Sequence, residues 1–407
     1  MTEGFQMSEI ILDSLRQTPL QEQRTEICER KGLGHPDTIC DAIMDEVSRA
    51  LSLEYLERFG SIMHHNIDKG LLVAGDVEVA FGGGKVVKPM LLVFGDRATF
   101  TVGSETIPVE DITIKTAKEW ITNNLRLVDP DNHVKYDVEL KRGSQALTDI
   151  FQRKEKYLGA NDTSAAVGFA PLTPTEQTVR DTEFYINSQD FKKEFPETGE
   201  DVKVMGLRKD DMLDLTIGTA FIDSYIDNES KYFRLKEKVL EKIKQYVESK
   251  VDMKLNLDLN TADRPGRGIG GLYMTVLGTS ADGGDCGQVG RGNRVNGIIP
   301  LNRPTCSEAA CGKNPVSHVG KIYNILTYKI ADEVYSKVSG IKEVYIWLLS
   351  QIGRPINLPK IVSSQLILES NTSMKDVARP VEEVIQGELD KLDVFCNDLV
   401  YGKVKLC

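Results

Sequence analysis

Two glycine-rich stretches of the sequence carry acidic and basic residues at short spacing. The first, Ser280 to Arg294, reads SADGGDCGQVGRGNR, and the second, Glu308 to Pro315, reads EAACGKNP. Glycine lets backbone amides approach a ligand closely. Carboxylates bind metal ions, and Arg or Lys side chains bind phosphate oxygens. This combination is typical of a site for a polyphosphate with Mg²⁺, and a polar surface loop is the alternative interpretation.

A third motif, Lys31 to Asp37 (KGLGHPD), precedes a segment with apolar residues at helical spacing. It places His35 and Asp37 at the expected helix start, where free N–H groups and the helix dipole attract anions. An Asp cap beside an incidental histidine is also open from these residues alone. Three shorter motifs also have plain structural alternatives. HHNIDK at 64–69 could be a polar strand end, GANDTS at 159–164 could be a turn, and DVK at 201–203 could hold a solvated ion pair.

The segments that must position these motifs alternate between strand and helix patterns. The spacing of apolar residues predicts a first helix at 38–59, capped by Asp37 and Thr38 and ended by Gly60. Further helices are predicted at 111–127, 175–187, 230–250, 317–338 and 374–395. Strands are predicted at 70–81, 90–100, 133–140, 164–169, 201–207, 213–221, 253–259, 272–278 and 344–350. Paired strands between single helices favour an α+β fold with antiparallel or mixed sheets covered by helices.

Composition favours a cytoplasmic globular enzyme. The chain has 407 residues, of which 41% are hydrophobic and 27% charged, and its net charge is −11. This charge argues against nucleic-acid and membrane partners, because both favour a basic face. Seven scattered cysteines without a secretory signal predict reduced thiols. No Pro-rich linker divides the chain, so we expect an N-terminal arm at 1–24 and one compact body at 25–407.

Together and in this order, the motifs resemble those of methionine adenosyltransferases (S-adenosylmethionine synthetases), in particular their archaeal-type branch. The resemblance runs from about residue 25 to the C-terminus and includes GKNPVSHVGK at 312–321 and QIGRP at 351–355. It implies three similar α/β subdomains around a pseudo-threefold axis, at approximately 25–130, 131–255 and 256–407. It also implies a homodimer, or a dimer of dimers, with active sites at the subunit interface.

The resemblance further implies a reaction and its ligands. The methionine sulfur attacks C5′ of ATP, and the triphosphate leaves and is hydrolysed to phosphate and diphosphate. Mg²⁺ is the implied cofactor, and the sequence leaves a need for K⁺ open. Two other interpretations remain, namely a different ATP–Mg²⁺-dependent phosphohydrolase or transferase, and a nucleotide-binding protein without turnover.

The resemblance also implies roles for individual residues. His35 corresponds to a histidine that contacts the leaving triphosphate, and Asp37 corresponds to a magnesium ligand. The residues that correspond to phosphate-binding cations are Lys203, Arg291 and Lys313. Those that correspond to contacts with the methionine amino group, the ribose and the nucleoside are Asp162, Asp201 and Asp285, respectively. Gly143 and Ser144 resemble part of an ATP-site loop, beside a mobile gate at 144–151.

The chain departs from the bacterial pattern at four positions. Thr38 stands where the bacterial pattern has a lysine after the GHPD carboxylate, and Gly292 stands where it has the lysine of an Arg-Lys pair. In the later loop, His318 replaces a second lysine and Gly320 replaces a magnesium-binding aspartate. Arg294 is the predicted substitute cation, with pairing to a surface carboxylate as the alternative. His318 is expected to line the ATP site. Glu308 and Asp282 are the candidates for the second magnesium ligand.

Overall fold

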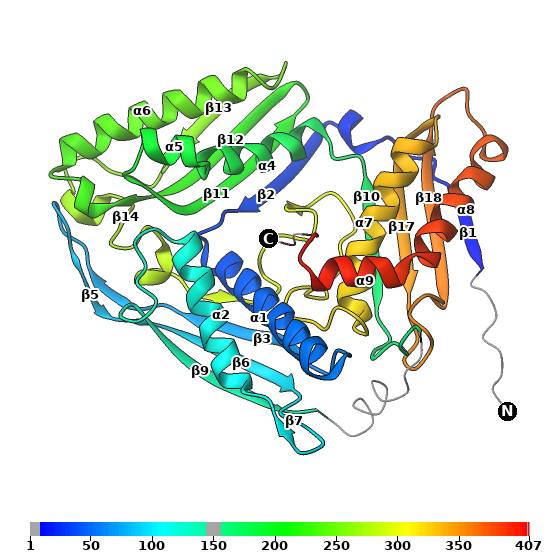
Figure 1. The fold of residues 1–407 in the computed structure, drawn as a ribbon. Coiled ribbons are helices and arrows are strands. Elements are labelled where there is room, and N and C mark those ends of the chain that lie inside the picture. Colours follow the sequence, from blue (N-terminus) through cyan, green and yellow to red (C-terminus); the bar gives the residue numbers. More distant parts are fainter. Residues whose placement is uncertain (1–8, 144–155, 405, 407) are drawn as a thin grey trace.

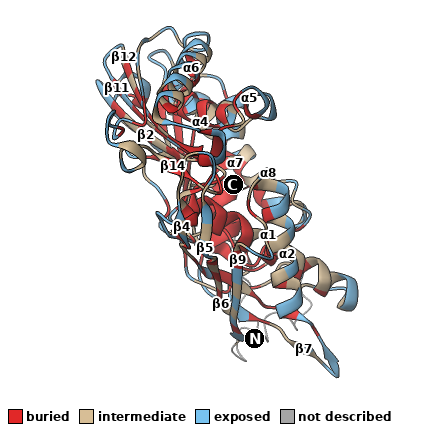
Figure 2. Ribbon diagram, turned by 90° about the vertical axis from the view of Figure 1, so that its left-hand side faces the viewer, coloured by how far each residue is buried: buried red, intermediate tan, exposed pale blue. Residues whose placement is uncertain are grey.

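The computed structural model describes residues 9–143, 156–404 and 406. Three larger sheets lie behind a layer of helices in this part of the chain (Figure 1). The view turned by 90° separates the strands from the helices, and buried residues concentrate where the two layers meet (Figure 2). No helix in the described ranges is long and apolar enough to cross a membrane.

The first sheet lies under α1 (Pro36–Phe59) and α2 (Val109–Asn124). Its strands, in spatial order, are β15 (Gly287–Gln288), β3 (Asn66–Val73), β6 (Met90–Ala98) and β9 (Val134–Arg142). Every second residue of β6 is buried from Met90 to Phe94, as expected for a strand with one face on a core. Gly60, at φ 67°, ends α1 as predicted. Two small hairpins flank the sheet: β4 (Asp76–Glu78) with β5 (Lys85–Lys88), and β7 (Thr101–Val102) with β8 (Glu105–Thr106).

The second sheet carries the strand that leads into the KGLGHPD motif. Its order is β13 (Lys254–Leu259), β12 (Met212–Ile222), β11 (Thr198–Lys209), β2 (Thr25–Lys31) and β16 (Ile299–Pro300), with β14 (Met274–Thr275) beside β12. The helices next to it are α4 (Pro174–Ile186), α5 (Gln189–Glu194) and α6 (Glu229–Glu248). Thr173 and Glu176 start α4 with a capping box.

The third sheet joins the two ends of the chain. Its order is β1 (Ile10–Ser14), β18 (Ile361–Leu368), β17 (Ile341–Leu349) and β10 (Ala165–Ala170). Helix α7 (Val319–Lys337) packs on β10 and β17, and α8 (Met374–Asp390) and α9 (Leu392–Val400) follow. Part of the expected N-terminal arm is therefore a strand, because β1 pairs in parallel with β18.

The three larger sheets share one pattern. Each contains two neighbouring antiparallel strands and a parallel edge strand, which is β9, β13 or β1. The prediction of mixed sheets covered by helices is confirmed, and the fold is mixed α/β. Short 3-10 turns connect the elements at Leu20–Glu22, Asp223–Tyr225, Gly268–Gly271 and Ser280–Asp282.

Several element predictions were wrong or incomplete. The strand expected at 70–81 is divided between β3 and β4, which lie in different sheets. Of the strand expected at 272–278, only Met274–Thr275 pairs, because the N–H groups of Val276 and Leu277 bind the Asp282 carboxylate and Gly278 turns the chain at φ 79°. The final helix is two helices that meet at Lys391. Strands β2 and β18 were not predicted. In the described part of the chain, the free thiols include Cys28, Cys40, Cys286, Cys306 and Cys396.

Candidate active site

His35 caps the start of α1. Its Nδ1 accepts a hydrogen bond of 3.2 Å from the backbone N–H of Asp37, so the prediction that Asp37 and Thr38 form the cap was wrong. Because Nδ1 is an acceptor, the ring proton lies on Nε2. Burial lowers the pKa of His35 and outweighs the nearby carboxylate of Asp201. The ring is therefore neutral at pH 7 and offers an Nε2–H donor.

The loop before His35 lies directly against β11. The N–H of Gly32 donates to the carbonyl of Val202 at 2.6 Å, and that of Gly34 donates to the carbonyl of Glu200 at 2.9 Å. A Cβ on Gly34 would lie 2.5 Å from the Asp201 nitrogen, so this approach requires glycine. The contact brings the DVK motif of β11 next to His35.

Asp201 connects β11 to the first glycine-rich loop. Its Oδ2 accepts hydrogen bonds from the backbone N–H of Ser280 at 2.9 Å and from the Ser280 hydroxyl at 2.5 Å. The carboxyl group is buried, and burial raises its pKa. Lys203, two residues along the strand, is half-exposed, and its Nζ lies 3.2 Å from Glu29 Oε1.

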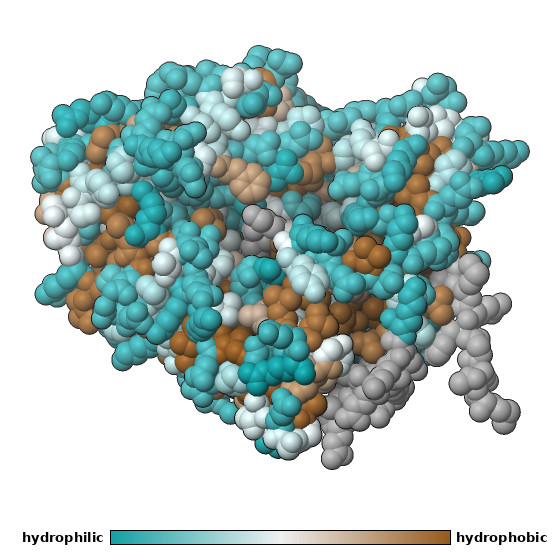
Figure 3. All heavy atoms as spheres, viewed as in Figure 1, coloured by the Kyte–Doolittle hydropathy of each residue, from teal (hydrophilic) through white to brown (hydrophobic). Residues whose placement is uncertain are grey.

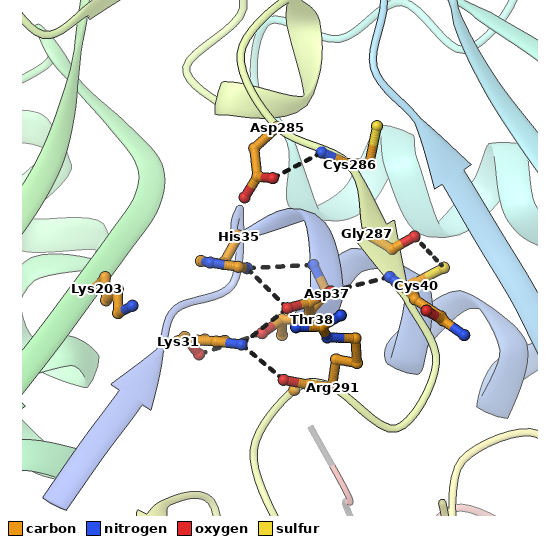
Figure 4. A network of polar contacts seen from close by, with 12 residues as sticks. Lys31, His35, Asp37, Thr38, Cys40, Lys203, Asp285, Cys286, Gly287 and Arg291 are labelled. Carbon is orange, nitrogen blue, oxygen red and sulfur yellow. Dashed lines mark hydrogen bonds and ion pairs between the residues drawn. The ribbon is translucent and has the colours of Figure 1, made fainter.

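Asp37 is held from two sides (Figure 4). Its Oδ1 accepts from the N–H of Gln288 at 2.9 Å, and its Oδ2 lies 2.8 Å from Lys31 Nζ. The same ammonium donates to the carbonyl of Arg291 at 2.7 Å. Lys31 was not predicted as a site residue, although it belongs to the KGLGHPD motif. We name the His35 cluster for these neighbouring residues: Lys31, His35, Asp37, Asp201, Lys203, Asp285 and Arg291.

The loop at 285–294 presents Asp285 and Arg291 to solvent, while Arg294 points inward. The Arg294 guanidinium donates to the carbonyls of Gly290 and Gly292 at 3.1 Å each, and to that of Cys306 at 3.4 Å. Such contacts hold a loop together. They favour neither the predicted role as substitute cation nor the alternative of a surface ion pair.

Asp41 is a further residue that the motifs missed. It lies one helical turn after Asp37, and this spacing is the feature that could have pointed to it. Its Oδ1 accepts from the N–H of Gly290 at 2.8 Å, and burial raises its pKa to about 7. A Cβ on Gly292 would lie 2.2 Å from Asp41 Oδ2. A side chain at position 292 would therefore require the Asp41 carboxylate to move.

A second cluster lies at the start of α7. His318 caps this helix, and its Nδ1 accepts from the N–H of Gly320 at 3.2 Å. Burial, and then the charge of Lys313, lower the pKa of His318 to about 3. Lys313 is buried, and its Nζ lies 2.5 Å from Asp68 Oδ2 and 3.1 Å from Glu308 Oε2. Asp68 belongs to the HHNIDK motif, for which a plain strand end was an alternative.

Asp162 belongs to the same region. Its carboxylate accepts from the N–H of Thr163 at 2.7 Å and from the hydroxyl of Ser164 at 3.0 Å. The preceding N–H, that of Asn161, donates to the carbonyl of Ser317 at 3.2 Å, next to the helix cap. We name the Lys313 cluster for Asp68, Asp162, Glu308, Lys313 and His318.

Two predicted loop residues have different outcomes. Gly143 packs on an imidazole, since a Cβ there would lie 2.4 Å from His64 Nδ1. Ser144 and the gate expected at 144–151 lie outside the described residues. Among the described residues, no hydrogen bond or ion pair joins the His35 cluster to the Lys313 cluster.

The candidate metal ligands lie apart from one another. No group of three or more acidic, His or Cys side chains is placed to hold a metal ion in the described part of the chain. Asp282 is buried, and its Oδ2 accepts from the N–H groups of Val276 and Leu277 at 2.7 and 2.8 Å. Asp37 and Glu308 each pair with a lysine. Mg²⁺ suits such sparse ligands, because it commonly binds through one or two carboxylates together with substrate phosphates.

The sequence of this chain is similar to those of known S-adenosylmethionine synthetases. The profile of the S-adenosylmethionine synthetase (AdoMet synthetase) family matches residues 8–403. An S-adenosylmethionine synthase of Pyrococcus abyssi is 48% identical over 399 residues, which are 98% of this chain and 99% of that protein. A probable S-adenosylmethionine synthase of Aquifex aeolicus is 45% identical over 389 residues, which are 95% of this chain and 96% of that protein.

A solved structure has a similar fold. An unusual S-adenosylmethionine synthetase from Campylobacter jejuni matches with a TM-score of 0.61 over 93% of both chains. Its sequence is only 16% identical, so this likeness concerns the fold alone. The profile and the sequence identities to archaeal proteins extend over nearly the whole chain. This chain therefore belongs to the archaeal-type S-adenosylmethionine synthetase family.

Proposed function

We propose that the His35 cluster and the Lys313 cluster together form the active site of this enzyme. The reaction is that of the family: ATP, L-methionine and water give S-adenosylmethionine, phosphate and diphosphate. The observation that carries the site assignment is the cap geometry of His35, which fixes a neutral ring with Nε2–H as a donor. Such a donor suits the oxygen that leaves C5′ of ATP.

The chemistry requires stabilisation of a leaving triphosphate with about four negative charges while a sulfonium forms. In the proposed site, His35 donates to the departing oxygen. Lys203, Arg291 and Lys313 contact the phosphates. A hydrogen-bond donor that is held in place before the reaction needs no reorganisation when charge develops. The bonds that fix His35 and its loop support this role.

Three carboxylates are proposed to orient the substrates. Asp162 binds the methionine ammonium, and its carboxylate is already held by Thr163 and Ser164. Asp201 contacts the ribose, and Asp285 lies near the nucleoside. The hydrogen bonds between Asp201 and Ser280 support this arrangement, because they bring the loop that carries Asp285 to β11.

Mg²⁺ is the proposed cofactor, and it would neutralise charge on the triphosphate. Asp37 is the proposed ligand in the His35 cluster, and Glu308 is proposed in the Lys313 cluster. The contacts of Asp282 favour a loop-holding role for that carboxylate. The sequence leaves a dependence on K⁺ open.

We infer that the active site joins the His35 cluster of one subunit to the Lys313 cluster of its partner in a homodimer. No hydrogen bond or ion pair between the two clusters is present among the described residues of one chain, which fits this inference. The shared pattern of the three sheets supports three subdomains related by a pseudo-threefold axis. The face that carries α1, α2 and α9 has hydrophilic residues with hydrophobic patches between them (Figure 3), and we propose that the partner packs on the sheet side. A cytoplasmic location fits the free thiols.

A product assay tests the proposal against its alternatives. The purified enzyme is incubated with ATP, Mg²⁺ and methionine, and S-adenosylmethionine, phosphate and diphosphate are quantified by mass spectrometry and ion chromatography. We expect equal amounts of all three products. ATP hydrolysis without S-adenosylmethionine would favour a phosphohydrolase, and ATP binding without turnover would favour a non-catalytic protein. Loss of product formation in His35→Asn and in Lys313→Met would tie the activity to both clusters.

A further inference from the structure

Lys31, the last residue of β2, connects the start of α1 to the loop that carries Arg291. Its ammonium lies 2.8 Å from Asp37 Oδ2 and 2.7 Å from the carbonyl oxygen of Arg291 (Figure 4). The side chain is 15% exposed, so the pair is largely shielded from water. The Lys31 ammonium therefore pairs with the carboxylate of Asp37, which is proposed to bind Mg²⁺.

Two side chains hold the backbone of Lys31. The Asn293 amide accepts from its N–H at 2.9 Å and donates to its carbonyl at 2.7 Å. The Thr38 hydroxyl donates to the same carbonyl at 3.2 Å. These bonds fix the point from which the side chain extends. They leave its four-carbon stem able to turn.

Lys31 also lies opposite a second lysine. In the antiparallel pairing of β2 with β11, its direct partner is Lys203. Like charges at such positions are destabilising. In the free enzyme each lysine has its own carboxylate: Asp37 for Lys31, and Glu29 for Lys203 at 3.2 Å. A polyphosphate between the two lysines would attract both.

We propose that Lys31 is a phosphate-binding residue that occupies Asp37 in the free enzyme, is displaced by the divalent cation and then contacts the triphosphate together with Lys203. This inference rests on the proposed function. In the bacterial pattern a lysine follows the GHPD carboxylate, and Thr38 stands there in this chain. The Thr38 hydroxyl instead donates to the Lys31 carbonyl, and the Lys31 ammonium reaches the Asp37 carboxylate from the preceding strand.

This arrangement makes the two ligands depend on each other. The metal competes with Lys31 for Asp37, and the phosphates draw Lys31 away, so each ligand favours binding of the other. Removal of the ammonium should therefore strengthen metal binding and weaken phosphate binding. A residue with a merely structural role would not shift the two affinities in opposite directions.

Calorimetry on the full chain tests this directly, with Mn²⁺ alone and with inorganic tripolyphosphate alone in the presence of a chelator. For Lys31→Met we expect the Kd for Mn²⁺ to fall roughly tenfold and the Kd for tripolyphosphate to rise roughly tenfold, each about 1.4 kcal/mol. Unchanged or weaker Mn²⁺ binding would overturn the proposal. If Lys31→Met does not fold, Lys31→Gln, which keeps hydrogen-bond donors without the charge, is judged by the same criteria.

Four further variants make the result specific. Lys203→Met should weaken tripolyphosphate binding and leave Mn²⁺ binding unchanged. The double variant Lys31→Met with Asp37→Asn should lose the gain in Mn²⁺ affinity. If His35→Asn and Asp37→Asn keep wild-type turnover, the proposed site itself fails. If both lose turnover and Lys31→Met shows no opposite shifts, the inference about Lys31 alone fails.

Discussion

Helices α1 and α7 begin with the same cap and offer opposite charges. In each, a buried histidine precedes the helix, and its Nδ1 accepts from the N–H two residues later, at 3.2 Å in both cases. That later residue is Asp37 in α1 and Gly320 in α7. A Cβ on Gly320 would lie 3.1 Å from Lys313 Cε and 3.1 Å from the ring of His318, so glycine leaves room for the lysine.

The difference shows that the cap and the chemistry are separable. The histidine satisfies a backbone N–H in both helices, but the neighbouring residues decide which ligand each start can bind. The α1 start presents a carboxylate, which suits a cation. The α7 start presents an ammonium, which suits phosphate but is unfavourable next to a helix N-terminus. Asp68 and Glu308 therefore balance Lys313 in the free enzyme. In the proposed site, a magnesium polyphosphate would contact both starts.

The comparison is tested most strongly by replacing each histidine with asparagine, which also caps helices. His35→Asn should lower kcat by roughly 10²–10³, because it removes a donor to the developing charge. His318→Asn should lower kcat by only about tenfold, since its ring is assigned to binding rather than to the leaving oxygen. Both should keep their thermal unfolding temperature within a few degrees. Equal losses in the two variants would show that the starts are not specialised.

A second test separates the carboxylate of α1 from that of the glycine-rich loop. Asp37→Asn should raise the Mg²⁺ concentration for half-maximal activity at least tenfold, because it weakens a metal ligand. Asp282→Asn should leave this concentration unchanged and lower the free energy of unfolding by roughly 1–3 kcal/mol, because it weakens bonds to two buried N–H groups. The reverse pattern in Mg²⁺ titrations and denaturant unfolding would make Asp282 the ligand.

The two arginines of the loop sharpen the comparison further. Arg291→Ala should raise the KM for ATP and slow triphosphate hydrolysis about tenfold without a change in unfolding, because its side chain is exposed. Arg294→Ala should mainly destabilise the protein by roughly 1–3 kcal/mol, because its guanidinium holds three carbonyls. S-adenosylmethionine formation and triphosphate hydrolysis are measured separately. If Arg294→Ala lowers activity without lowering the free energy of unfolding, the result would support Arg294 as the substitute cation.

The smallest effect concerns pH. The pKa of His318 is lowered to about 3 in the folded state, mainly by burial, and an unfolded histidine titrates near 6.5. As the pH falls below about 6.5, the unfolded state binds a proton that the folded state does not, so stability falls. His318→Asn should reduce this slope by up to about 1.4 kcal/mol per pH unit. Denaturant unfolding between pH 7 and 5 checks it, and identical slopes would contradict the buried neutral ring.

Local patterns predicted most of the longer helices and strands, because each depends on the periodicity of its own residues. Gly60 ended α1 where a left-handed residue was expected. The strand at 272–278 failed because a distant carboxylate, Asp282, takes the N–H groups that a sheet would use. Strand β1 was missed because its parallel partner, β18, lies about 350 residues away in the sequence.

The candidate site was predictable as a set of motifs but not as two groups. His35, Asp37 and Arg291 were assigned by resemblance, and the structure places them together with Lys203 and Asp285 (Figure 4). The bridging role of Lys31 depends on how β2, the start of α1 and the Arg291 loop converge, and that convergence is a tertiary property. Arg294 looked like a phosphate ligand by spacing, whereas its contacts with backbone carbonyls depend on the path of the loop.

The central claim is that the two helix starts act on one substrate from different subunits. His35→Asn and Lys313→Met are co-expressed with different affinity tags, and the heterodimer is purified through both tags. In this heterodimer one site carries both defects and the other carries none, as a symmetric dimer with shared sites requires. The account predicts about half of the wild-type specific activity, with each mutant homodimer nearly inactive. A heterodimer as inactive as the homodimers would place the complete site within one chain and contradict it.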